Sequence, residues 1–149
     1  MALPRECVYR TSLKWESGNV WRQCGEGVAV ECAPPPEFGG PPNHWTPEHL
    51  LLAAIESCTL SAFLAYAQHA RIGLLDYRSA SEAKMVLEGK AYRFTEAVVR
   101  VEVAVREGDA KSAQSLLEKA HSRCPLTRSV NFPVRLEAKI AEHQSRTQP

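Results

Sequence analysis

The feature that most constrains this chain is an apolar run near its centre. Residues 50–67 read LLLAAIESCTLSAFLAYA and contain a single charge, that of Glu56. The three residues Thr46, Pro47 and Glu48 precede the run. They are typical of a helix start, because threonine can cap, proline favours the first helical position and an acid complements the helix dipole. We therefore predict one long central helix.

This helix is expected to run to about Arg71, with Gly73 as its stop. Its apolar residues occur on every side as far as Gln68, so it should be wrapped by protein. A single chain of 149 residues could hardly bury all of it, which favours a dimer whose central helices share one core. A membrane span is the alternative reading. We do not favour it, because the run is near the lower length limit and a carboxylate at its middle costs about 2.5–3.5 kcal/mol.

Period-two alternation predicts strands on both sides of the central helix. The clearest is residues 93–106, where valines at every second position alternate mostly with charged residues. Residues 74–87 would pair with it through a hairpin at Glu88-Gly89-Lys90. The remaining predicted elements are strands at 8–15, 20–24, 28–32 and 133–140, and a helix at 110–122 capped by Asp109. We predict an α+β fold with antiparallel sheets around the long helix, in a single domain of residues 1–149.

Composition narrows the classes of function. The 18 basic and 17 acidic residues leave a formal net charge of +1, which gives no broad positive surface for nucleic acid. The first residues show no secretory signal pattern. Five cysteines cannot all pair within one chain. We therefore expect a cytoplasmic protein whose cysteines are catalytic, metal-binding or inert, and no Cys/His spacing suits zinc.

Two segments resemble the OsmC/Ohr family (osmotically inducible protein C, organic hydroperoxide resistance). Residues 47–58, PEHLLLAAIESC, are similar to that family's N-P-E-x-L-L-x-A-A-x-x-x-C segment. Residues 124–129, CPLTRS, are similar to its C-P-x-S/T motif. The spacing of the two motifs and the order of the predicted elements also suit the family. The resemblance covers most of the chain, and it implies an OsmC-like fold and an intertwined homodimer with two sites at the subunit interface.

The resemblance also implies roles for individual residues. In characterised members the first cysteine reduces organic hydroperoxides and the second resolves the resulting sulfenic acid as a disulfide. By position, Cys58 would be peroxidatic and Cys124 resolving, and Glu48 matches a family glutamate ten residues before the first cysteine. Active members also have an arginine in the turn after the first strand. Residues 14–19 hold no arginine here, and Arg22 is the nearest substitute.

The residues themselves predict two unequal thiols. Cys58 lies well inside its helix among uncharged neighbours, and an apolar setting raises the pKa of a thiol. Cys124 precedes Pro125 at the start of a helical turn, where backbone N–H groups favour an anion. Nearby basic residues add positive potential: His121, Arg123 and Arg128. On these grounds Cys124 would be the more acidic thiol, whereas the resemblance assigns the first attack to Cys58.

The two glutamates of the helix raise questions of geometry. Glu48 cannot touch Cys58 along a straight helix, because ten residues rise about 15 Å. Its role would need a break in the helix or a contact across the dimer. Glu56 is two residues before Cys58 and faces away from it. If buried, its carboxylate would need a cation, which Arg22 or Lys14 could supply.

Two functions follow from these observations. The first is a thiol-dependent peroxidase for organic hydroperoxides, in which Cys58, Cys124, Glu48 and Arg22 form the site and an external thiol or dithiol regenerates the pair. It implies no metal, flavin or haem. The second is a non-enzymatic OsmC-fold dimer that binds a small apolar ligand and has redox-sensitive cysteines. The missing turn arginine favours the second function; the cysteine pair and Glu48 favour the first, which we prefer.

Overall fold

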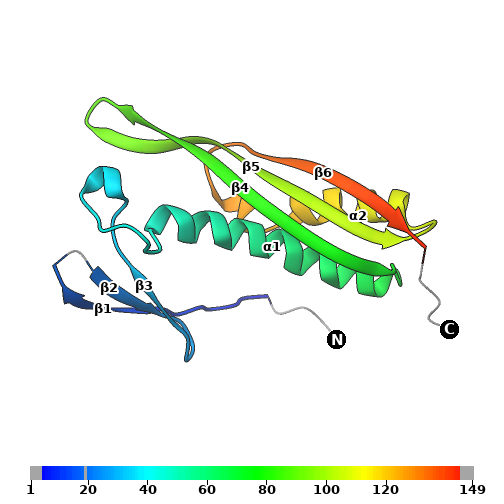
Figure 1. The fold of residues 1–149 in the computed structure, drawn as a ribbon, viewed down its shortest axis with the longest axis horizontal. Helices are drawn as coiled ribbons and strands as arrows, with labels where there is room; N and C mark the ends of the chain where they lie inside the picture. The colour runs from blue at the N-terminus through cyan, green and yellow to red at the C-terminus, as the bar shows by residue number, and fades with distance from the viewer. Residues whose placement is uncertain (1–4, 19, 145–149) are drawn as a thin grey trace. The chain divides into compact units, whose positions relative to one another are not determined.

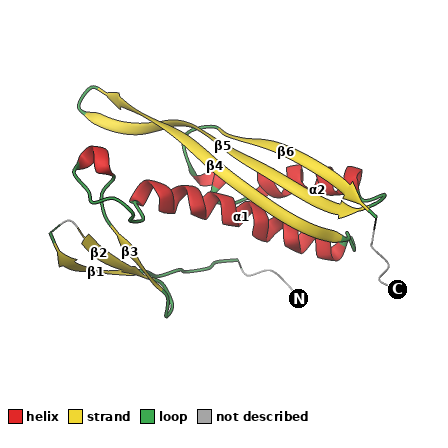
Figure 2. Cartoon of the chain, viewed as in Figure 1, coloured by secondary structure: helices red, strands yellow, loops and turns green. Residues whose placement is uncertain are grey.

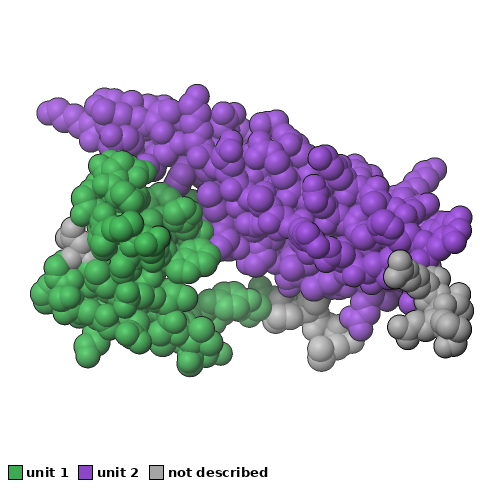
Figure 3. Space-filling view, in the orientation of Figure 1, with its two compact units in different colours: residues 1–51 green, residues 52–149 purple. Residues whose placement is uncertain are grey.

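The structure is a computed structural model that describes residues 5–18 and 20–144, drawn in Figures 1 and 2. Asn19, in the turn after the first predicted strand, lies outside the described residues. The chain divides into two compact units, residues 1–51 and residues 52–149 (Figure 3). The α+β class is confirmed, with helices and strands in the predicted order.

The first unit contains an antiparallel sheet of three strands in the order β1-β2-β3. These strands are β1 (Ser12–Ser17), β2 (Val20–Cys24) and β3 (Ala29–Cys32). The first strand begins later than the predicted residue 8. The reason is its partner: Ser12 already pairs with Cys24, the last residue of β2, so earlier residues have no neighbouring strand to bond.

The Pro/Gly-rich segment at residues 33–43 is a loop with one 3-10 turn (η1, Pro36–Phe38) inside it. Gly40 packs so closely on the preceding chain that an added Cβ would lie 1.7 Å from the Pro34 carbonyl oxygen. Only glycine fits such an approach. At the end of the loop, the backbone carbonyl of Trp45 accepts the N–H of Ala33 at 2.9 Å. This hydrogen bond holds the two ends of the loop together just before the central helix.

The central helix α1 spans Pro47–His69 without interruption. It starts as predicted, because the Thr46 hydroxyl oxygen accepts the N–H of His49 at 3.2 Å. It ends two residues before the predicted Arg71, which instead adopts a left-handed conformation with φ 57. Gly73 is needed for a different reason: an added Cβ would lie 2.5 Å from the Arg106 side chain.

The second unit holds a sheet in the order β4-β5-β6. These strands are β4 (Leu74–Glu88), β5 (Ala91–Arg106) and β6 (Val134–His143). The first two form the predicted hairpin, but β5 and β6 pair in parallel, so the expectation of antiparallel sheets is wrong for this pair. A parallel pair needs a long crossover, and helix α2 (Ala110–Arg123) with the 3-10 turn η2 (Thr127–Ser129) provides it.

The core of this unit lies between the sheet and the helices, which cover the same face of it (Figure 1). Alternate valines of β5 are buried there, while Arg100 and Glu102 point to the opposite, exposed face. This confirms the face predicted from period-two alternation. The main buried side chains are Val99, Val101, Val103 and Val105 of β5, Ile55, Thr59, Phe63 and Ala67 of α1, and Ala113, Leu117 and Ala120 of α2.

The start of α2 is capped from outside the helix. Asp109 stands at the capping position, but its carboxylate accepts the N–H of Gly73 at 2.8 Å and makes no hydrogen bond to its own helix. The prediction that its side chain caps α2 is therefore wrong. Instead, Glu142 at the end of β6 accepts the N–H groups of Gly108 and Ala110 at 3.1 and 3.0 Å. A negative group at this position suits the helix dipole.

Candidate functional site

Helix α1 carries the first candidate residue, Cys58, which is partly buried. The hydroxyls on either side of it are occupied by the helix itself. Ser57 donates to the Ala53 carbonyl at 2.7 Å, and Thr59 donates to the Ile55 carbonyl at 3.2 Å. Serine and threonine hydroxyls inside helices commonly donate a hydrogen bond to a backbone carbonyl one turn earlier. Neither hydroxyl is therefore directed at the Cys58 sulfur.

The second candidate, Cys124, lies where α2 ends and is fully buried. Because Pro125 disfavours the helical conformation of the residue before it, Cys124 adopts φ −58 and ψ 119 and the chain turns. The turn then closes around the thiol. The Thr127 N–H donates to the Cys124 sulfur at 3.4 Å, and the Arg128 N–H donates to the Cys124 carbonyl at 3.1 Å.

The last turn of α2 is anchored to the sheet by His121, which is only 8% exposed. Its Nε2 lies 2.9 Å from the Val134 carbonyl oxygen at the start of β6. A carbonyl only accepts, so Nε2 carries the hydrogen. One turn later, Cys124 donates its N–H to the His121 carbonyl at 3.3 Å. This chain of bonds fixes the Cys124 turn to β6.

The structure brings the two cysteines together. Each thiol acts on the pKa of the other, and the backbone of Leu126 acts on the pKa of both. Both are free thiols, as are the other three cysteines. Residues far apart in the sequence, on α1 and after α2, thus form a reduced dithiol inside the second unit.

The two thiols differ in acidity for identifiable reasons. Burial raises the pKa of Cys58, and its hydrogen bond to Cys124 and the charge of that residue raise it further, while Leu126 opposes them. Burial also acts to raise the pKa of Cys124, but hydrogen bonds from Cys58, Thr127 and Leu126 outweigh it and lower the pKa overall. The pKa of Cys58 is therefore raised and that of Cys124 lowered from the ordinary thiol value.

The other two predicted site residues, Arg22 and Glu48, belong to the first unit. Arg22 lies on β2, where its Nε pairs with Glu16 Oε1 at 2.9 Å and its side chain is 54% exposed. Glu48 lies in the first turn of α1, and its Oε2 is buried with no hydrogen-bond partner among the described residues. The helix between Glu48 and Cys58 contains no break that would bring the two together along it.

Glu56 has partners that the sequence did not indicate. The expected cation from Arg22 or Lys14 is replaced by two hydroxyls of β4: Ser79 donates to Oε1 at 2.5 Å and Ser81 to Oε2 at 2.9 Å. Two hydroxyl donors satisfy a partly buried carboxylate without a counter-charge. The sequence does show two serines at alternate positions, which lie on one face of a strand. It does not show that this face packs against the helix that carries Glu56.

Tyr77 is the neighbour of this group on β4, and its ring packs on Phe63 with centroids 5.9 Å apart. Its hydroxyl is buried and has no hydrogen-bond partner in the described part of the chain. Burial, together with the Glu56 charge, raises the pKa of Tyr77 to about 12, against a smaller opposing effect of Ser79. Tyr77 is therefore held in its neutral form.

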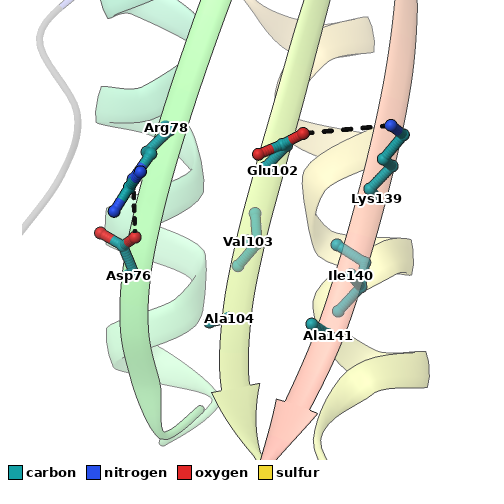
Figure 4. Close-up of a pocket in the computed structure, with 8 residues that line it drawn as sticks. All are labelled: Asp76, Arg78, Glu102, Val103, Ala104, Lys139, Ile140 and Ala141. Atoms are coloured by element: carbon teal, nitrogen blue, oxygen red, sulfur yellow. Dashed lines mark hydrogen bonds and ion pairs between the residues drawn. The ribbon is translucent and has the colours of Figure 1, made fainter.

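A hollow of about 300 Å³ lies on the exposed face of the β4-β5-β6 sheet (Figure 4). Small side chains, Ala104 and Ala141, form its floor between long charged ones. The charges pair with each other: Arg78 Nε lies 3.0 Å from Asp76, and Lys139 Nζ lies 4.0 Å from Glu102. Because the hollow is open and its charged groups are paired, the dithiol is the stronger candidate site.

None of the described residues forms a group of three or more His, Cys, Asp or Glu side chains that could hold a metal ion. The candidate site is formed by the thiols of Cys58 and Cys124 and by the backbone around Cys124. The fold is α+β, with one free thiol in the central helix and a second directly after the crossover helix. These features place the chain in the class of small dithiol proteins. The chain belongs to the OsmC-like protein family, whose model matches residues 40–139.

Solved structures agree with this assignment. An OsmC-like protein of unknown function from Vibrio cholerae matches with a TM-score of 0.81 and 17% identity, over 90% of this chain and 100% of that one. An organic hydroperoxide resistance protein OsmC from Legionella pneumophila matches with 0.68 and 23%, over 91% and 99%. The organic hydroperoxide resistance protein OhrB of Bacillus subtilis matches with 0.62 and 19%, over 89% and 100%. The comparison with curated proteins gave no match.

Proposed function

We propose that this protein is a thiol-dependent peroxidase that reduces organic hydroperoxides through Cys58 and Cys124. The observation that carries the proposal is a pair of free thiols, Cys58 and Cys124, that act on each other's pKa within an OsmC-like fold. Two similar structures belong to organic hydroperoxide resistance proteins, which supports the same class of substrate.

The burial of the two sulfurs supports the proposed order of events. Cys58 is partly exposed, so a hydroperoxide can reach it, whereas Cys124 is fully buried. Cys58 would attack the peroxide oxygen and become a sulfenic acid. Cys124, whose pKa is affected by Cys58, would then form the disulfide with it, and an external thiol or dithiol would reduce that disulfide.

The proposed working form is a cytoplasmic homodimer. Helix α1 is the one helix in the described chain long and apolar enough to cross a membrane, with a mean hydropathy of 1.7. Only 22% of that window is buried within the chain, and Leu64 on it is 44% exposed. A second copy is the occupant we propose for this surface. The roles proposed for Glu48 and Arg22 at the cysteines require that this dimer bring them to the site.

One observation favours the alternative of a non-enzymatic ligand binder. The pKa of Cys58 is raised, and a protonated thiol attacks peroxides slowly. Arg22, the nearest substitute for the turn arginine, is paired with Glu16. If no cation reaches Cys58, the fold could hold an apolar molecule and keep its cysteines without turnover.

The deciding experiment is single-turnover oxidation of the reduced protein by cumene hydroperoxide and, separately, by hydrogen peroxide. Free thiols are counted over time in the wild type and in Cys58→Ser and Cys124→Ser. We expect the wild type to lose two thiols rapidly with the organic peroxide. Cys58→Ser should abolish this loss, and Cys124→Ser should lose one thiol and accumulate a sulfenic acid.

The matched control is Cys32→Ser, since Cys32 is a fully buried thiol whose pKa is raised by burial. It should react like the wild type. Thiol loss no faster than that of free cysteine, in all four proteins, would contradict the peroxidase proposal and leave the ligand-binding alternative.

A further inference from the structure

Helix α2 buries one polar side chain, that of His121, which is 8% exposed. The other buried residues of this helix are apolar: Ala113, Leu117 and Ala120. The His121 Nε2–H donates to the Val134 carbonyl at 2.9 Å. Its Nδ1 has no hydrogen-bond partner among the described residues. Within that part of the chain, the bond to Val134 is therefore the one hydrogen bond of the imidazole.

The acceptor of this bond belongs to a part of the sheet that is itself held by hydrogen bonds. Val134 is the first residue of β6 and pairs with Ala97 of β5, the middle strand of the sheet. The N–H of Ala97 donates to the Pro133 carbonyl at 2.9 Å, and Ala97 is buried. His121 therefore joins the end of α2 to a buried and hydrogen-bonded part of the sheet.

The backbone continues this attachment to the thiol. Cys124 donates its N–H to the His121 carbonyl at 3.3 Å, and its sulfur accepts the Thr127 N–H at 3.4 Å. Ser122 and Arg123 are exposed, so His121 is the last buried residue of α2 before the sulfur. The place of the Cys124 sulfur relative to the sheet thus depends on the bond between His121 and Val134.

We propose that His121 is a positioning residue for the resolving step, because its bond to the Val134 carbonyl holds the Cys124 sulfur in place. The inference rests on the proposed function and deepens it. In the resolving step Cys124 gives its proton to solvent, and its sulfur attacks the sulfenic sulfur of Cys58. The S–S bond forms and the S–O bond breaks, and the hydroxide that leaves takes up a proton and becomes water.

The two steps of the reaction depend on His121 to different extents. Disulfide formation is sensitive to where the Cys124 sulfur lies, because an S–S bond is about 2 Å long and its dihedral angle is restricted. The first attack is made by Cys58 on α1, which is not attached to the sheet through His121. Loss of the His121 bond should therefore slow the second step and leave the first unchanged.

The test uses one equivalent of dithiobis(nitrobenzoate) in place of a peroxide, in a background with Cys7, Cys24 and Cys32 replaced by serine. Cys58, the partly exposed thiol, should react first and release one thionitrobenzoate. The fully buried Cys124 should then attack the mixed disulfide on Cys58 and release the second. The absorbance of free thionitrobenzoate follows both releases.

We expect His121→Leu to slow the second release by about tenfold or more, since a misplacement of about 1 Å can slow a reaction about a hundredfold. The first release should not change. His121→Gln can present its Nε2–H to the Val134 carbonyl and should recover most of the rate. Equal second releases in the wild type and His121→Leu, or no recovery in His121→Gln, would overturn the proposal.

Two controls separate position from stability, and circular dichroism checks that each variant is folded. His69→Leu replaces an exposed histidine at the end of α1 and should leave both releases unchanged. Ala113→Gly weakens α2 at a buried position without touching the Val134 bond. It should also leave the second release unchanged, and an equal slowing there would overturn the proposal. If His121→Leu does not fold, His121→Met makes the same test.

These outcomes are separate from those of the proposed function. A wild type that is inert to cumene hydroperoxide, but whose second release depends on His121, retains the positioning role and loses the peroxidase. A wild type that reduces the peroxide, and whose second release is the same without the imidazole, retains the peroxidase and loses the positioning role.

Discussion

At the scale of single residues, the protein uses hydroxyls and backbone N–H groups where related chemistry often uses cations. Glu56 is held by two serine hydroxyls, and the Cys124 sulfur receives the Thr127 N–H. Such donors stabilise an anion without adding a titratable charge. At Cys124, hydrogen-bond donors rather than a neighbouring cation lower the pKa of the thiol.

Tyr77 gives a prediction about pH at this scale. Its pKa is raised to about 12, so the folded state favours the neutral phenol. Its stabilising effect is fully present below the ordinary tyrosine pKa of about 10 and is lost as pH rises toward 12. We expect the wild type to lose stability across this window, and Tyr77→Phe to lose less. Urea unfolding at several pH values measures the difference; identical slopes with pH would contradict the assignment.

The acidity of the two thiols shows what the residues could and could not predict. Cys58 among apolar neighbours and Cys124 before Pro125 indicated opposite pKa shifts, and the structure agrees. Local sequence is enough to predict the direction of a pKa shift where the residues around the group belong to its own turn or helix. It failed for Glu56, because the serines that bind it come from β4, and the register of a helix on a strand is set by packing.

At the scale of elements, two carboxylates outside the helices hold the connections between helices and strands through hydrogen bonds to backbone N–H groups. Asp109 binds the N–H of Gly73 just before β4, while Glu142 of β6 caps α2. The sequence identified Asp109 as a capping residue but not its partner. The reason is that Gly73 lies 36 positions away, beyond the reach of local patterns.

We expect Asp109→Ala to lower the free energy of unfolding by about 1–3 kcal/mol, since it leaves a part-buried N–H without its charged acceptor. Glu107→Ala, an exposed acid two residues earlier, is the matched control and should change stability little. Urea denaturation of the two variants measures the difference. Equal stabilities would mean that the Gly73 bond contributes nothing.

At the scale of the whole molecule, alternation predicted which residues form the sheets but not how all of the strands pair. The valine pattern placed β5 and its buried face correctly. The direction of β6 depends on the crossover through α2, which reverses the chain before the last strand. A strand of either direction shows the same period of two, so this part of the topology was not available from the sequence.

The proposed homodimer leads to a prediction at the same scale. Leu64 on α1 is 44% exposed, and in the dimer it would be covered by the partner subunit. Sedimentation equilibrium should give about twice the chain mass of 16.5 kDa for the wild type. Leu64→Lys should shift the protein toward the monomer mass, because the interface would bury an unpaired charge. Lys111→Glu on the exposed side of α2 is the control; a wild type of single-chain mass would contradict the dimer.

The parallel pairing of β6 has a consequence for how the thiol pair comes into being during synthesis. The turn that holds Cys124 is attached to β6 through the hydrogen bond between His121 and the Val134 carbonyl. Strand β6 is the last strand of the described chain to be synthesised. A half-made chain therefore exposes Cys58 before any partner sulfur has been fixed in place. A chain that ends before β6 would lack the Val134 carbonyl to which His121 is bonded, so the turn that holds Cys124 would lose this attachment to the sheet.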